Sequence, residues 1–213
     1  MTQPDVALTD YALALECSIF AFLLRPVKQG SQSLARWFII FFLSIAVAAA
    51  VGGTVHGFYE DPASCGSRKL WPVTLIAIGV TAFAGTNIAA TLQFDKKTAI
   101  HFARAAVAVF IVYCAVVLFL ADSFLIAIVD YLPVVIFLGW VFFQRCRQTH
   151  QHAFRNGLIG VFMMLLAAVA QQARLGIHPK YFNHNAVYHL IQAIALLLLF
   201  TTARFLNKQN EAI

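Results

Sequence analysis

Seven long apolar stretches divide the sequence, and short polar connections separate them. A membrane-spanning helix needs roughly 20 mostly apolar residues. Stretches that meet this condition cover approximately residues 6–24, 37–59, 71–93, 99–121, 124–143, 155–173 and 184–206. The connections carry residues that turn the chain, such as Pro26, Gly66 and Pro179. The pattern predicts an all-α, polytopic membrane bundle of seven transmembrane helices, forming a single domain over residues 1–213.

The composition supports this prediction. Hydrophobic residues make up 61% of the chain and charged residues 11%, whereas soluble domains contain about 45–50% apolar and about 25% charged residues. The four cysteines have no CxxC spacing, which argues against a disulfide framework and against a sulfur-ligated zinc site. The net charge of +6 is spread over short loops, so we expect no nucleic-acid partner.

The distribution of lysine and arginine predicts the orientation in the membrane, because cytoplasmic loops carry an excess of both. Ten lie in the first, third and fifth loops and the C-terminal tail: Arg25, Lys28, Arg36, Lys96, Lys97, Arg145, Arg147, Arg155, Arg204 and Lys208. Four lie in the other connections: Arg68, Lys69, Arg174 and Lys180. We expect an extracytoplasmic N-terminus and a cytoplasmic C-terminus, in a bacterial inner membrane. The N-terminal segment has no basic region, so the first helix should stay in the mature protein.

Ionisable side chains within the apolar stretches are the first candidates for function. On insertion scales each costs roughly 2.5–3.5 kcal/mol at mid-membrane. The candidates are Asp10, Glu16, His56, Arg104, Asp130, His184 and His189. In the predicted topology the three histidines and two aspartates, on four helices, all fall near the extracytoplasmic face. If the bundle closes, they can converge on one site.

Three histidines near one membrane face suggest a metal site. Neutral imidazole is the commonest metal ligand, and three histidines plus a water form an open zinc site. Zinc lowers the pKa of that water to about 7 and so supplies a hydroxide nucleophile. We predict that His56, His184 and His189 bind zinc, while Asp10 or Asp130 orients a ligand or acts as catalytic base. The alternative is that these histidines are there because the interface is wet.

The last apolar stretch, which contains FNHNAVYHLIQA, has the densest polar signal. Asn185, His189 and Gln192 lie at i, i+4 and i+7, on one face of a helix that should look into the bundle. Asn185, Gln192 and Glu16 are the candidates to surround the metal ligands, although Asn185 and Gln192 could equally hydrogen-bond neighbouring helices. On an ideal helix, His184 lies about 140° from His189.

The segments TDYALAL, GGTVHGF and HNAVYHLIQ, with a histidine near the end of the second helix and a pair opening the seventh, resemble the CREST superfamily. That group includes alkaline ceramidases and adiponectin and progestin receptors, and the likeness is to a small bacterial branch. The resemblance implies zinc held by three histidines and hydrolysis of a lipid amide. His56 and His189 match two ligand positions. The sequence departs from the family at Asn185, where the family has histidine, at Gly52, where it has serine, and in KLWPVTLIAIG, which lacks its aspartate.

Three functions follow as expectations. The first is a zinc-dependent intramembrane hydrolase of a lipid amide or ester, with its site near the extracytoplasmic face. The second is a non-enzymatic lipid-binding or receptor-like protein that keeps the scaffold. The third is a b-type haem protein, in which His56 and His189 would be the axial ligands. In the first two, a membrane lipid is the substrate or the ligand.

Overall fold

The computed structural model describes residues 1–24, 32–178 and 182–211 of the chain. These residues form seven helices: α1 (Pro4–Leu23), α2 (Gln32–Phe58), α3 (Cys65–Gln93), α4 (Lys96–Phe119), α5 (Phe124–Thr149), α6 (His152–Gln172) and α7 (His184–Glu211). Each is long and apolar enough to cross a membrane. The prediction of an all-α bundle of seven membrane helices is confirmed. Arg25, Pro26, Lys28, Pro179 and Lys180, used above for the loops and the orientation, lie outside the described residues.

Most helices are longer than the apolar stretches that predicted them. α3 begins six residues before its stretch and α5 ends six residues after its own, because a helix continues through the polar edge of the membrane once its end groups are satisfied. Side chains satisfy them at three starts: Ser64 accepts from the backbone N–H of Ser67, Asp95 from Lys97, and Ser123 from Leu125. Short polar side chains at this position cap free helix N–H groups.

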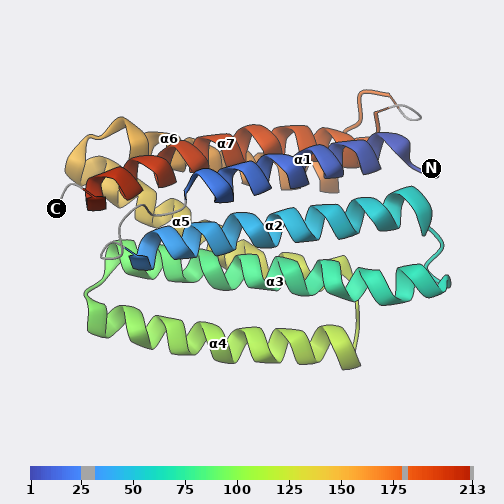
Figure 1. The fold of residues 1–213 in the computed structure, drawn as a ribbon, viewed down its shortest axis with the longest axis horizontal. Coiled ribbons are helices and arrows are strands. Elements are labelled where there is room, and N and C mark those ends of the chain that lie inside the picture. Colours follow the sequence, from blue (N-terminus) through green and yellow to red (C-terminus); the bar gives the residue numbers. More distant parts are fainter. Residues whose placement is uncertain (25–31, 179–181, 212–213) are drawn as a thin grey trace.

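The helices run up and down along one long axis, as Figure 1 shows. α1 begins at the same end of the bundle at which α2 ends and α3 and α7 begin; we call this the N-terminal end. α1 packs between α2 and α7, and α3 separates α2 from α4. α4 is the outermost helix, and its buried residues are Ala106, Tyr113 and Val117. Its outward side chains, such as Val109 and Ile111, are apolar and exposed, as expected for a lipid-facing surface.

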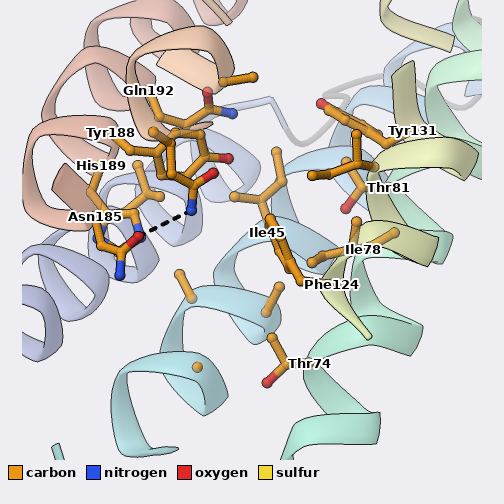
Figure 2. Close-up of a pocket in the computed structure, with 18 of the residues that line it drawn as sticks. Ile45, Thr74, Ile78, Thr81, Phe124, Tyr131, Asn185, Tyr188, His189 and Gln192 are labelled. Carbon is orange, nitrogen blue, oxygen red and sulfur yellow. Dashed lines mark hydrogen bonds between the residues drawn. The ribbon is translucent and has the colours of Figure 1, made fainter. Parts of the chain in front are cut away.

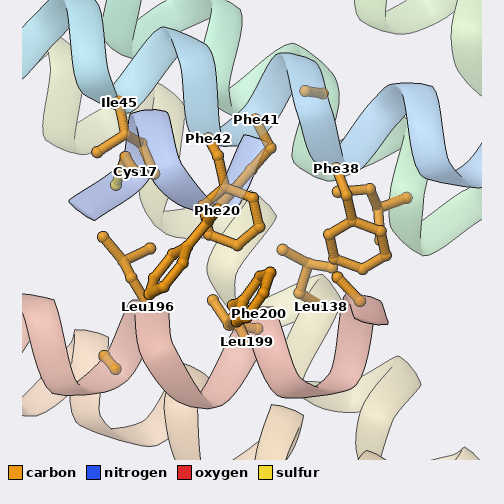
Figure 3. Packing of buried hydrophobic residues seen from close by; sticks show 14 of the residues in the cluster. Cys17, Phe20, Phe38, Phe41, Phe42, Ile45, Leu138, Leu196, Leu199 and Phe200 are labelled. Atoms are coloured by element: carbon orange, nitrogen blue, oxygen red, sulfur yellow. The ribbon is translucent and has the colours of Figure 1, made fainter. Parts of the chain in front are cut away.

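An aromatic cluster fills the half of the bundle away from the N-terminal end (Figure 3). The rings of Phe20 on α1 and Phe200 on α7 stack with centroids 4.3 Å apart, and Phe42 on α2 meets Phe20 edge-on at 5.5 Å. Phe41 and Leu138 extend the cluster towards α5, and both are almost fully buried. Lipid solvates apolar side chains as well as another helix does, so the hydrophobic effect does not drive membrane helices together. Close van der Waals packing of this kind holds them together instead.

Candidate functional site

The other half of the bundle contains a partly open cavity of about 370 Å³ (Figure 2). This volume is typical of small-molecule sites, which measure about 300–1,000 Å³. Six helices line the cavity, while no described residue of α4 does. On α2 the lining residues are Ile45, Ala48, Ala49, Gly52 and His56, and on α5 they are Phe124, Ala127, Ile128, Tyr131, Leu132 and Val135. The spacing of three and four residues means that each helix presents one face to the cavity.

The floor of the cavity is the apolar core itself. Ile45, Val135 and Met164 line the cavity and also belong to the core cluster that contains the aromatic rings. Polar side chains lie closer to the N-terminal end: His56 is two residues before the end of α2, and Asp10 is six residues, about 9 Å, after the start of α1. Most polar lining side chains therefore lie in the outer, polar part of the cavity, and the inner part is mainly apolar; Thr81 lies deeper, with its hydroxyl bonded to Ser44 and to the backbone carbonyl of Ala77.

A buried histidine–aspartate pair joins α7 to α1 in the polar part. His189 Nε2 lies 3.2 Å from Asp10 Oδ1, and both side chains are at most 10% exposed. His189 Nδ1 lies 2.9 Å from the hydroxyl of Thr9. That hydroxyl donates its hydrogen to the backbone carbonyl of Asp5 or Val6, so it accepts from Nδ1–H. A favourable Nε2–Oδ1 contact then requires one proton between these two atoms.

Asn183 places the start of α7 next to this pair. Its side-chain oxygen accepts from the backbone N–H groups of Asn185 (2.9 Å) and Ala186 (3.2 Å), which caps the helix. Its own backbone N–H donates to Asp5 Oδ2 on α1 at 3.0 Å. The cap and this bond fix the first turn of α7 against α1, so that Asn185, Tyr188, His189 and Gln192 face the cavity.

Two further contacts border the polar part. Gln171 at the end of α6 donates from Nε2 to Asn185 Oδ1 on α7 at 3.1 Å, the dashed line in Figure 2. On the opposite side, the ring of His56 meets Trp71 of α3 edge-on at 6.2 Å. Trp71 is fixed in turn, because its indole N–H donates to the backbone carbonyl of Asp122 at 2.8 Å.

The structure brings together five of the eight predicted site residues. Asp10, His56 and His189 line the cavity with Asn185 and Gln192.

The other three, His184, Asp130 and Glu16, do not line the cavity, and helical phase explains the first two. His184 and Asp130 each lie one residue, about 100°, away from a lining residue on their helices. Asp130 is on the α4 side, within electrostatic range of Tyr113 and Cys114. Glu16 is half-buried, six residues along α1 from Asp10.

This arrangement does not fit the three-histidine zinc site. His184 is outside the cavity lining, and no three His, Cys, Asp or Glu side chains of the described residues are placed to hold one metal ion. A metal or haem iron on His189 Nε2 would also have to replace the proton that this nitrogen shares with Asp10. The described residues thus give no direct support for bound zinc or haem, and both interpretations stay untested predictions.

Thr9, Tyr131 and Tyr188 were not among the predicted site residues. Thr9 holds the histidine ring, and both tyrosines line the cavity. The candidates were chosen among side chains that can carry a charge near neutral pH and the polar face of the last helix, and these three residues belong to neither group. A signal was present for Tyr131, because it shares a helical face with Phe124, Ala127 and Ile128.

Fold and site together define a class: a bundle of seven helices long and apolar enough to span a membrane, with a cavity that is mostly polar towards the N-terminal end and mostly apolar towards the core. The chain belongs to a family of unknown function (DUF6962), whose model matches residues 6–208. No curated protein matches the sequence. The family description names no activity, so the resemblance to the CREST superfamily stays a prediction.

Proposed function

We propose that this protein binds an amphipathic molecule, a membrane lipid or a lipid-derived compound, in its internal cavity. The observation that carries the proposal is the division of the cavity into an outer part with polar side chains and an inner part floored by Ile45, Val135 and Met164. An amphipath has the same division. Its hydrocarbon chain would give the apolar lining side chains the van der Waals contacts that an empty cavity does not provide. Its polar group would meet the side chains around His189.

The size of the cavity limits the ligand. At about 370 Å³ the cavity is near the lower end of the range for small-molecule sites. It suits one polar group with part of one hydrocarbon chain, so a two-chain lipid would leave most of its bulk outside.

The test is to identify what the protein carries and to block the cavity. Protein reconstituted in lipid nanodiscs is extracted with solvent, and the extract is analysed by mass spectrometry. In Ala48→Trp the indole fills the cavity from α2, whereas in Ala108→Trp it lies on the exposed surface of α4, which provides the matched control. We expect one amphipathic compound enriched in wild type and in Ala108→Trp, and absent from Ala48→Trp. Identical extracts from all three proteins would contradict the proposal.

A zinc-dependent lipid hydrolase is the second candidate. One observation favours it: His56 and His189, two of the three predicted ligands, line the cavity together with Asp10. Elemental analysis of the wild type, purified without chelator, beside His56→Ala and His189→Ala decides it. Near-stoichiometric zinc that both substitutions abolish would favour the hydrolase and justify assays on lipid amides and esters. A wild type that neither contains nor takes up zinc would exclude it.

We also propose that the N-terminal end of the bundle, with the polar part of the cavity, faces the extracytoplasmic side of a bacterial inner membrane. The support is the count of ten lysines and arginines against four. A ligand would then enter from the outer leaflet or from the extracytoplasmic solution.

A further inference from the structure

Two polar atoms at the cavity have no hydrogen-bond partner among the described residues: the Tyr131 hydroxyl on α5 and Gln192 Oε1 on α7. Both atoms are buried, and the Gln192 side chain as a whole is only 6% exposed. Figure 2 shows the Tyr131 hydroxyl pointing across the cavity towards the helix that carries Gln192. Buried polar groups in proteins almost always have a partner, so these two atoms call for a partner from outside the chain, either water or a polar group of a ligand.

The two residues lie at similar depths. Tyr131 is seven residues after the start of α5, about 11 Å, and Gln192 is eight residues after the start of α7, about 12 Å. In hydrogen bonding they are complementary, because a phenol donates and an amide oxygen accepts. A ligand group between them must therefore be able to accept and to donate.

The charges around the cavity disfavour an ionised group. Among the described lining residues none is lysine or arginine, so an anion would have no cationic partner. The lining groups that can carry a charge near neutral pH are Asp10, His56 and His189, and Asp10 already pairs with His189. An ion in such surroundings would lose its hydration without compensation.

We infer that the cavity recognises an uncharged polar group on a single hydrocarbon chain, which accepts a hydrogen bond from Tyr131 and donates one to Gln192. A primary alcohol is the simplest such group. This inference rests on the proposed function and specifies its ligand. Both residues would act as specificity residues, because each would bond the polar group of the ligand.

The experiment compares probes that share one twelve-carbon chain. Binding of radiolabelled 1-dodecanol, dodecanoate, dodecylammonium and 1-methoxydodecane is measured in nanodiscs, and the signal of Ala48→Trp is subtracted as non-specific partitioning. We expect dodecanol to bind at least ten-fold more tightly than either ion. The ether can accept but not donate, so it should bind roughly three- to ten-fold more weakly than dodecanol.

Two variants assign the bonds. Tyr131→Phe should weaken dodecanol and the ether by the same roughly three- to ten-fold factor, because both accept from the phenol. Gln192→Leu should weaken dodecanol alone and remove its advantage over the ether. The ether comparison is made on wild-type protein, so it holds even if a variant fails to fold.

The outcomes separate the two proposals. If no probe binds wild type above the Ala48→Trp background, the proposed function fails and the inference fails with it. If probes bind but an ion matches dodecanol, or the ether binds as well as the alcohol, only the inference is overturned. Preferential binding of dodecylammonium that is lost in Asp10→Asn would make Asp10 the polar anchor instead.

Discussion

The Thr9 hydroxyl fixes which nitrogen of His189 carries a hydrogen, since it donates to the α1 backbone and accepts from Nδ1–H at 2.9 Å. Thr9→Val keeps the shape of the side chain but leaves a buried N–H without a partner. We expect a loss of about 1–3 kcal/mol in the free energy of unfolding, seen as a lower midpoint of thermal unfolding in detergent. Thr9→Ser retains the hydroxyl and should stay close to wild type. A Thr9→Val variant as stable as wild type would contradict the role of the bond, and a loss in Thr9→Ser alone would show that the methyl group matters instead.

Gly52 and Gly53 are neighbours on α2 with different surroundings. A Cβ on Gly53 would lie 2.8 Å from Asp10 Cβ and 3.2 Å from the Ala7 carbonyl oxygen, so Gly53→Ala must push α1 away. A Cβ on Gly52 would lie 3.5 Å from Thr74 Cγ2, an ordinary contact. We expect Gly53→Ala to lower the unfolding midpoint, while Gly52→Ala stays neutral or stabilises by up to about 1 kcal/mol, the helix preference of alanine over glycine. Circular dichroism melts of the two variants test this difference.

At the scale of residues, an ionisable side chain in an apolar stretch could be placed along the membrane axis from the sequence, but the neighbouring helix that it faces could not. Asp10, His56 and His189 were predicted to meet because they are ionisable and near one membrane face, and they do line one cavity. Asp130 satisfied the same criterion but does not line the cavity. The sequence places a residue along a helix, whereas its direction depends on which helices become neighbours. α4 lies outside the ring of six helices around the cavity, and no hydropathy pattern predicts that position.

At the scale of elements, the start of α7 determines what faces the cavity. The Asn183 side chain caps α7 at two backbone N–H groups, and its backbone bonds Asp5 of α1. Asn183→Ala removes the cap, which should cost about 1 kcal/mol and loosen the first turn. Hydrogen exchange should then be faster at the amides of Asn185 and Ala186 and unchanged near Leu199. Asn183→Ser, which can still cap, provides the control, and unchanged exchange in the alanine variant would contradict the role of the cap.

The sequence predicted that each helix exists but not where each helix begins and ends, because hydropathy does not detect the residues that cap a helix. Hydropathy detects the stretch that lipid must solvate, and all seven stretches became helices. The ends depend on caps such as Ser64 and Asp95, which extended α3 and α4 beyond their apolar parts. The cavity-facing sides of α2 and α5 show the same limit: their apolar residues can meet lipid, a neighbour or a ligand, and hydropathy treats these three alike.

At the scale of the whole molecule, the bundle is asymmetric from end to end. The half near the C-terminal end of α7 is filled by aromatic rings, while the other half holds the cavity. The cavity floor belongs to the aromatic core, so access is from the N-terminal end or from between the helices there. This arrangement fits a protein that receives a ligand from one side of the membrane. A through-path would require the aromatic half to separate.

The side from which the ligand arrives can be measured with cysteines. Cys65 is exposed at the first residue of α3, at the N-terminal end of the bundle. With Cys17, Cys114 and Cys146 replaced by alanine, a membrane-impermeant maleimide should label Cys65 on intact spheroplasts if this end lies outside, as the lysine and arginine count predicts.

The control is Thr149→Cys in a protein without other cysteines. Thr149 is exposed at the last residue of α5, at the opposite end, so labelling there should need lysed cells. The reverse pattern would put the polar part of the cavity on the cytoplasmic side. The proposed ligand would then come from the inner leaflet or the cytoplasm, while its required chemistry, set by Tyr131 and Gln192, would be the same.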